Sequence, residues 1–175
     1  MMGTAATMGI DENLALAARR GKFRSLMPGI TAKEKAQYKE LLAELDLGLE
    51  NRITSKVGLL SGGQRQAITL LMASLKRPKL LLLDEHTAAL DPKTAAKVLD
   101  TTEKIVQKDN LTTIMITHNM KDAIAHGNRL IMMNSGNIIF DISGEEKKKL
   151  TVEDLLEKFA IASGKELDND RMMLG

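Results

Sequence analysis

The spacing of apolar residues predicts helices in the first part of the chain. Thr7 is placed to cap a first helix, and Thr31 and Glu34 have capping-box spacing at the start of a second. Ser61 is placed to cap a third, which must stop before Pro78 because proline cannot continue a helix. The apolar positions that define the three faces are Ile10, Leu14, Leu16 and Ala17, then Leu41, Leu42 and Leu45, then Ile68, Leu71, Met72 and Leu75.

The pattern changes after the third helix. A continuous apolar run at 80–83 predicts a strand buried on both faces, and it ends in two carboxylates. Asp91-Pro92 predicts a helix cap with proline at the first helical position, and the helix should continue to about Gln107. The β-branched run at 112–117 predicts a second strand.

The last third predicts a short helix, a hairpin and a final helix. Asn119 is placed to cap the short helix. Apolar segments at 129–133 and 137–142 flank the turn sequence at 134–136, which is typical of a β-hairpin. The segment 151–160 has the apolar spacing of a final helix.

This order of elements predicts an α/β protein with a separate helical lobe. We expect a helical subdomain at 1–78 and a sheet-containing core at 79–142. A C-terminal helix and tail follow at 143–175.

Composition narrows the range of functions. The 175 residues are 43% hydrophobic and 27% charged, as in ordinary globular proteins, and the net charge of +2 is too small to favour nucleic-acid binding. The chain has no cysteine, which excludes disulfides and thiolate metal sites and fits a reducing compartment. The longest apolar runs are too short to span a bilayer, and the first residues do not form a secretory signal.

The most specific feature is the run Leu60-Ser61-Gly62-Gly63-Gln64-Arg65-Gln66. Two glycines behind a serine cap leave backbone N–H groups accessible at the positive end of a helix, which favours a phosphate-sized anion. Ser-Gly-Gly alone would more often be a simple capped helix. The full run stands before an apolar strand that ends in Asp84-Glu85, and this combination favours a functional site.

Four motifs in the same order resemble those of ABC ATPases. The run 60–66 resembles the signature motif, and the segment 80–85 resembles the Walker B strand. The segment 89–92 resembles the D-loop, although its Asp91 can equally be a plain helix cap. Thr117-His118 resembles the His switch. The resemblance implies the C-terminal part of a P-loop NTPase fold, with a RecA-like parallel sheet and a helical signature subdomain.

The resemblance also implies a role for each residue. Asp84 would hold Mg²⁺ through water, Glu85 would act as the general base on the attacking water, and His118 would reach the γ-phosphate. The residues expected to contact ATP are Ser61, Gly62, Gly63, Gln64 and Asp91. The implied reaction is hydrolysis of ATP to ADP and phosphate.

Other charged and histidine residues are expected to be structural. His86 stands where many relatives have proline, and we interpret it as a tolerated variant and not as a second catalytic histidine. His126 is expected at a helix end. The mixed-sign run 145–149 is expected to be a solvated helix face.

The Walker A phosphate loop, Gly-x-x-x-x-Gly-Lys-Ser/Thr, does not occur in this sequence. The two Gly-Lys pairs, at 21–22 and 164–165, are followed by Phe23 and Glu166. A Q-loop glutamine cannot be placed either. The resemblance thus implies an N-terminally truncated domain, which we expect to bind Mg-ATP weakly and to show no appreciable turnover alone.

The family resemblance implies an ATP-binding subunit of a bacterial, import-type ABC transporter. Its expected partners are transmembrane permease subunits, a second nucleotide-binding domain in a head-to-tail homodimer and a solute-binding protein, with no nucleic acid. The expected location is the cytoplasm, peripheral to the inner face of the cell membrane. Two alternatives remain open: a soluble ABC ATPase of DNA repair or translation, and a non-catalytic product of a truncated gene.

Overall fold

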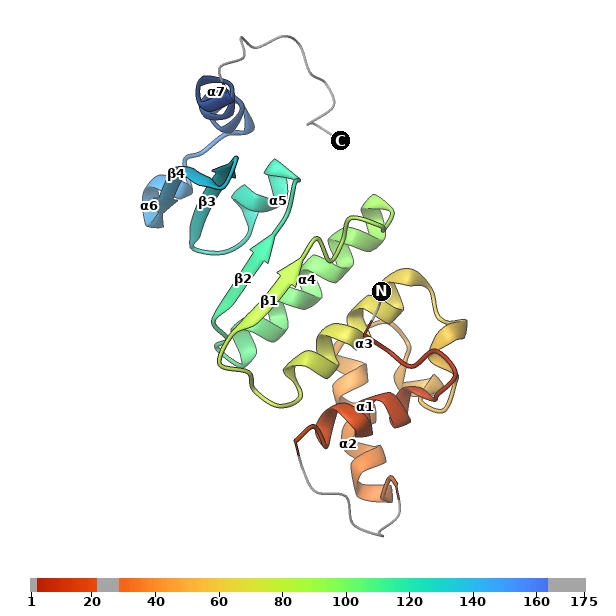
Figure 1. Ribbon diagram of the computed structural model, residues 1–175. Helices are drawn as coiled ribbons and strands as arrows, with labels where there is room; N and C mark the ends of the chain where they lie inside the picture. Colours follow the sequence, from red (N-terminus) through yellow and green to blue (C-terminus); the bar gives the residue numbers. More distant parts are fainter. Residues whose placement is uncertain (1–2, 22–28, 164–175) are drawn as a thin grey trace. The chain divides into compact units, whose positions relative to one another are not determined.

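The computed structural model describes residues 3–21 and 29–163, and it divides into two compact units, Met1–Met115 and Ile116–Gly175 (Figure 1). Helices and strands occur in the predicted order, and the α/β class is confirmed. The finer division at 1–78, 79–142 and 143–175 stays a prediction.

The first unit begins with a helical part. It contains α1 (Ile10–Ala18), α2 (Ala32–Glu44), two 3-10 turns, η1 (Glu50–Arg52) and η2 (Val57–Leu59), and α3 (Gly62–Ser74). Their apolar sides form one core in which several side chains are completely buried. The fully buried members are Ile10, Leu14, Leu42, Leu49, Val57, Ala67 and Ile68. The predicted apolar faces therefore meet, except at Leu16 of α1, which was expected on the buried face and is 45% exposed.

The cap predicted at Thr7 is wrong, and α1 is capped two residues later. Gly9 is the N-cap, and its amide donates to the Glu12 carboxylate at 2.6 Å. The backbone just before the helix pairs with a distant segment, because Val57 N donates to Met8 O at 3.0 Å and Ile10 N donates to Ser55 O. This pairing keeps the backbone before Gly9 extended, so the helix begins at Ile10. The capping box of Thr31 and Glu34 is confirmed.

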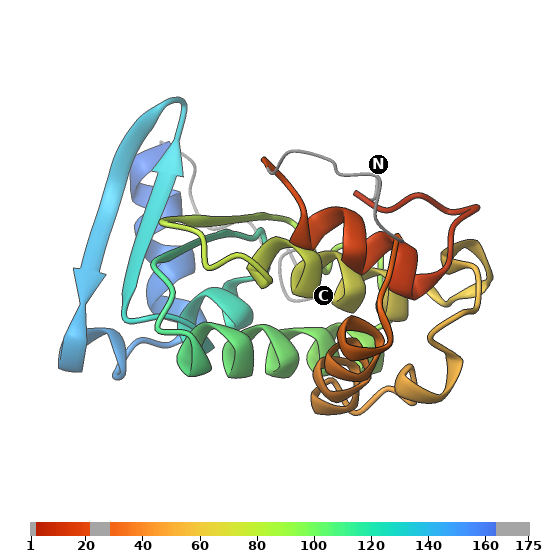
Figure 2. The ribbon, with the colours of Figure 1, turned by 90° about the horizontal axis from the view of Figure 1, so that it is seen from below.

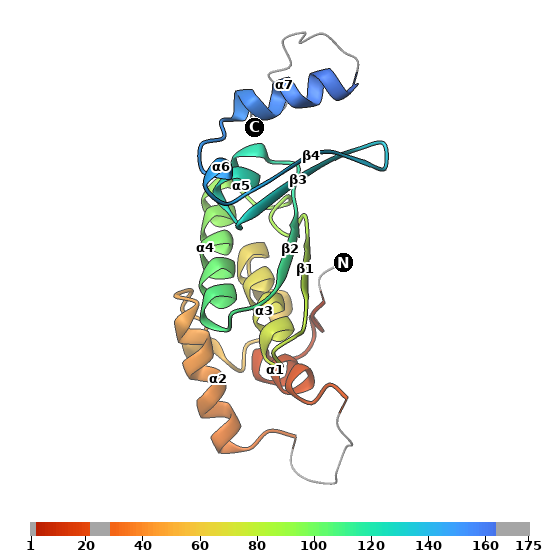
Figure 3. The ribbon, with the colours of Figure 1, turned by 90° about the vertical axis from the view of Figure 1, so that its left-hand side faces the viewer.

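A two-stranded sheet completes the first unit. The strands β1 (Leu81–Asp84) and β2 (Thr113–Ile116) are hydrogen-bonded neighbours that run in the same direction (Figure 1). The helices α3 and α4 (Pro92–Lys108) lie on the same side of these strands (Figures 2 and 3). Leu70 of α3 packs against Leu81 and Leu83, and this contact joins the helix to the sheet.

The expectation that 80–83 would be buried on both faces is wrong. Leu81 and Leu83 are buried, whereas the side chain of Leu82 is 65% exposed and that of Ile114 on the neighbouring strand is 52% exposed. The helices α3 and α4 both pack on one face of the sheet (Figures 2 and 3). Alternate side chains point to opposite faces of a strand, so only every second one is covered.

The second unit is built on the predicted hairpin. It contains α5 (Met120–Ala125), β3 (Arg129–Asn134), β4 (Asn137–Ser143), α6 (Gly144–Lys147) and α7 (Val152–Ser163). The strands are antiparallel, and the turn residues Ser135 and Gly136 both have positive φ, as a tight hairpin turn requires. Among the described helices, none is both long enough and apolar enough to cross a bilayer.

Candidate functional site

The site in the first unit is built around the N-terminus of α3. Ser61 is the N-cap, and its hydroxyl oxygen accepts from Gln64 N at 3.3 Å. Gln64 Oε1 in turn accepts from Ser61 N at 3.2 Å, and Gln64 Nε2 donates to Leu47 O at 3.4 Å. Gln64 therefore fixes the turn, and its side chain is already used in doing so.

Two amides at this helix end remain available. Gly62 and Gly63 occupy the first two helical positions, where no intrahelical acceptor exists, and no acceptor for their amides is found among the described residues. Ser61 is exposed, and its hydroxyl hydrogen can still donate. This arrangement can bind an anionic oxygen with two amides and one hydroxyl, assisted by the helix dipole.

The same glycines bring the turn against the start of α4. A Cβ atom on Gly63 would overlap Cγ2 of Thr94, and one on Gly62 would lie 3.2 Å from Cδ2 of Leu90. Gly63 is buried, so the absence of a side chain there permits the close approach of the two helices. The structure thus places the predicted signature turn beside the predicted D-loop, of which Leu90 and Asp91 are part.

Asp91 caps α4 and sets the position of its first turn. Its carboxylate accepts from Thr94 N at 3.1 Å. Hydrogen bonds from the side chain and from the backbone of Thr94 to the carboxylate hold the pKa of Asp91 below its ordinary value of 3.8. Asp91 is therefore ionised at neutral pH, and the cap interpretation is confirmed; a contact with nucleotide or with a second subunit stays a prediction.

Asp84 and Glu85 lie where β1 ends. Both are exposed. Glu85 has a φ of 42°, in the left-handed region that residues other than glycine seldom adopt, and its carbonyl accepts from Ala88 N at 3.1 Å. Such a conformation costs roughly 1–3 kcal/mol and tends to occur at functional sites. The turn thus directs the backbone sharply away from the strand immediately after Asp84.

The residues present fit a magnesium ion that is bound jointly by the protein and by a phosphate. They do not fit an ion whose ligands all come from the protein. Within residues 3–21 and 29–163, no three His, Asp or Glu side chains converge as a metal-binding group. Mg²⁺ is commonly held by one or two carboxylates together with water and substrate phosphates. One exposed carboxylate at Asp84 meets that requirement only when a phosphate supplies the other ligands.

The histidines at 86 and 118 differ in their surroundings. The imidazole Nε2 of His86 lies 3.2 Å from Oγ1 of Thr102, a buried residue of α4, so His86 is directed toward the helix. His118 is exposed and belongs to the second unit, where it directly precedes Asn119, the N-cap of α5. His126 is the C-cap of α5, at a helix end as predicted.

Sequence reasoning missed two residues. Thr94 limits what can stand at Gly63, but no local pattern announces a contact between residues 31 positions apart. Lys147 was expected on a solvated face, and this is wrong: the residue is only 3% exposed. Its neighbours Glu145, Glu146 and Lys148 are exposed, so composition alone gave no signal that Lys147 differs.

Comparison with known proteins gives one consistent match. Residues 4–88 match the family model described as ABC transporter. A tyrosine transport ATP-binding protein of Clostridioides difficile is 48% identical, over 92% of this chain and 64% of its own length. A phosphonates import ATP-binding protein of Cupriavidus metallidurans is 32% identical, over 86% of this chain and 53% of its own length. The chain therefore spans between half and two thirds of these relatives.

Solved structures agree in fold. An ATP-binding cassette of an ABC transporter in its ADP conformation superimposes with a TM-score of 0.71, at 24% identity, over 91% of this chain and 64% of that one. A dimeric cassette in a post-hydrolysis state, bound to ADP and phosphate, superimposes with a TM-score of 0.64 at 27% identity, over 81% of this chain and 59% of that one. The fold is that of a cassette ATPase.

Proposed function

Because this chain belongs to the ABC transporter family, we propose that it forms part of an ATP-hydrolysing subunit that drives transport through a membrane permease. The observation that carries the proposal is the end of α3. Two amides, for which residues 3–21 and 29–163 supply no acceptor, and one hydroxyl stand beside the Asp91 cap, in the same unit as the carboxylates of Asp84 and Glu85. This arrangement supports recognition of the terminal phosphate of a nucleotide.

The nucleotide would be held by a second subunit. The sequence has no phosphate loop of its own, whereas the α3 N-terminus is intact. In a head-to-tail dimer, Ser61, Gly62 and Gly63 would bind the terminal phosphate of the nucleotide that the second subunit holds. Asp91 would contact that subunit. The dimeric cassette with ADP and phosphate is consistent with such a second domain.

The remaining candidate residues would each take one role in ATP hydrolysis. Glu85 would accept a proton from the attacking water, and His118 would donate a hydrogen bond to the γ-phosphate. A magnesium ion, when bound, would neutralise charge on the phosphate oxygens. Asp84 would hold that ion through water. Gln64 would support Ser61 and would not itself contact phosphate, because its side chain is engaged in the capping box.

The partners and location follow from the same proposal. The names of the relatives support a membrane permease as partner and an import system, and the tyrosine transport relative supports an amino acid as cargo. A solute-binding protein would deliver that cargo. The protein would then lie in the cytoplasm, on the inner face of the membrane. Co-purification with ribosomes or DNA in place of a permease would favour a soluble ATPase of translation or repair.

Mg-ATP-dependent association tests the proposal. The chain is mixed with a family ATP-binding subunit that has an intact phosphate loop and whose catalytic glutamate is replaced by glutamine, so that ATP is retained. Light scattering after gel filtration should show a heterodimer with Mg-ATP and none with Mg-ADP. Ser61→Asp should abolish it, because aspartate still caps the helix but repels phosphate.

Ser61→Thr is the matched control, since it keeps both the cap and the hydroxyl. It should associate as the unchanged chain does. Nucleotide-independent association, or equal association of Ser61→Asp, would show that the end of α3 does not recognise phosphate.

A further inference from the structure

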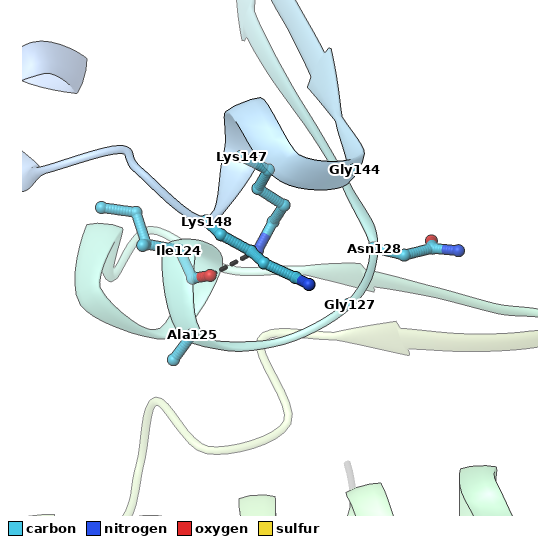
Figure 4. A pocket seen from close by; sticks show the side chains of 7 residues that line it. All are labelled: Ile124, Ala125, Gly127, Asn128, Gly144, Lys147 and Lys148. Carbon is cyan, nitrogen blue, oxygen red and sulfur yellow. Dashed lines mark hydrogen bonds between the residues drawn. The ribbon is translucent and has the colours of Figure 1, made fainter.

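Lys147 is a buried cation that holds the end of another helix. Its Nζ donates to the carbonyl oxygen of Ile124 (Figure 4) and, at 3.0 Å, to that of His126. These carbonyls belong to the last turn and the C-cap of α5, which intrahelical hydrogen bonds leave unpaired. Lys147 therefore joins α6 to the C-terminus of α5.

The charge of Lys147 lies beside the carbonyl groups at the C-terminal end of α5. Burial lowers the pKa of Lys147, and no ion pair to it is found among the described residues. A positive charge is favoured beside the partial negative charge at the C-terminus of a helix. The carbonyls of α5 are therefore what compensates the buried ammonium, and the contact depends on both elements.

A cavity of about 240 Å³ lies beside Lys147. Ile124, Asn128 and Gly144 line it, and Lys148, also at its wall, pairs with Glu145 at 2.7 Å. Because two of the three donors of the Lys147 ammonium are already directed to backbone carbonyls, at most one remains for a ligand. The cavity is thus better explained as space around the contact between Lys147 and the carbonyls of α5 than as a binding site.

The other end of α5 adjoins His118. Asn119 is the N-cap, and its side-chain oxygen accepts from Lys121 N at 2.9 Å and from Asp122 N at 3.3 Å. The amide of Asn119 donates to Oγ1 of Thr117 at 3.0 Å. His118 therefore lies between Thr117, which directly follows β2, and Asn119, which caps α5. That helix has only six residues, too few to be stable without tertiary contacts.

We propose that Lys147 is a positioning residue for His118: by fixing the C-terminus of α5 it holds the Asn119 cap, and through that cap the backbone of His118. The importance of this position for ATP hydrolysis rests on the proposed function. The structural part does not, because it concerns contacts within residues 117–147 alone. Lys147→Met should release α5, since methionine fills a similar volume but cannot donate to the carbonyls.

Amide hydrogen exchange and histidine NMR test this on the full chain without nucleotide. In Lys147→Met, the amides of Ala123 and His126, which are hydrogen-bonded in α5, should exchange about tenfold faster, the effect of losing a charge-assisted hydrogen bond. The ring-proton signal of His118 should shift. Lys147→Arg should restore both readouts at least in part, and Lys148→Met, at the exposed neighbour, should change neither.

The amides of the β3–β4 hairpin serve as the internal reference. Unchanged exchange in α5, or an unmoved His118 signal in Lys147→Met, would overturn the proposal. Equal loss of protection in the hairpin and α5 would also overturn it, because Lys147 would then support the whole unit. None of these outcomes bears on whether Ser61 recognises phosphate, so the two proposals fail separately.

Discussion

Gly63 and Thr94 are packed so closely that a single added methyl group at residue 63 would overlap Cγ2 of Thr94. The contact joins the first turn of α3 to the first turn of α4. The turn at 61–63, which is the candidate phosphate-binding site, is therefore packed against the helix that Asp91 caps. Glycine at 63 is therefore explained by helix packing.

Gly63→Ala should destabilise the chain. Replacing glycine by alanine in an open helical position normally stabilises by roughly 0.5–1 kcal/mol, whereas overpacking costs about 1–3 kcal/mol. We expect the packing cost to prevail and the free energy of unfolding in urea to fall. Thr94→Ser, which removes the obstructing methyl group, should recover most of that loss. A stabilised Gly63→Ala variant, or a loss that Thr94→Ser leaves unchanged, would contradict this packing of the two helices.

Acid should weaken the cap of α4. The pKa of Asp91 is lowered in the folded chain, so its contribution to stability is complete above the ordinary carboxyl value of 3.8 and is lost as pH falls below it. Asp91→Asn should keep a pH-independent cap. Melting temperatures measured from pH ~6 to ~2 should therefore converge for the two proteins in acid. Parallel curves would show that Asp91 does not stabilise α4 through its charge.

The local signals in the sequence were reliable where the partners are close in the chain. Ser61 with Gln64, Thr31 with Glu34 and Asp91 with Thr94 are each three residues apart, and every one of these caps forms. Short-range hydrogen bonds of this kind depend on little else. The caps at Ser61 and Asp91 place the two helix ends of the first unit that carry candidate chemistry, at α3 and α4.

Long-range contacts account for what the sequence could not predict. Pairing of Met8 with Val57 moved the α1 cap away from Thr7, and packing of both helices on one side of the sheet exposed Leu82. Lys147 is buried by its contact with a helix more than twenty residues earlier. Nothing in a charged run distinguishes that lysine from its neighbours before the fold is known.

Two adjacent leucines should differ sharply in their contribution to stability. Leu83 is 8% exposed and packs in the core between β1 and α3, so Leu83→Ala should cost about 2–5 kcal/mol. Leu82 is 65% exposed, and Leu82→Ala should change stability by no more than about 0.5 kcal/mol. Chemical denaturation of both variants measures the difference. Similar costs at the two positions would mean that both faces of the strand are buried.

A polypeptide of these 175 residues should not turn over ATP by itself. Nothing in it can form the loop that holds the phosphates against Asp84 and Glu85. A coupled phosphate-release assay should give the same background rate for the unchanged chain and for Glu85→Gln. Steady-state hydrolysis that Glu85→Gln abolishes would contradict this and would show that the chain binds ATP by another route.

The amide signals of Gly62 and Gly63 give the most direct test of phosphate recognition. In ¹⁵N-labelled chain, both should shift downfield when a loop-bearing partner subunit is added with Mg-ATP. Both amide signals should return to their original positions when Mg-ADP replaces Mg-ATP, because each amide gains a charged acceptor only from the terminal phosphate. A complex that forms with Mg-ATP while both glycine signals stay in place would contradict the account.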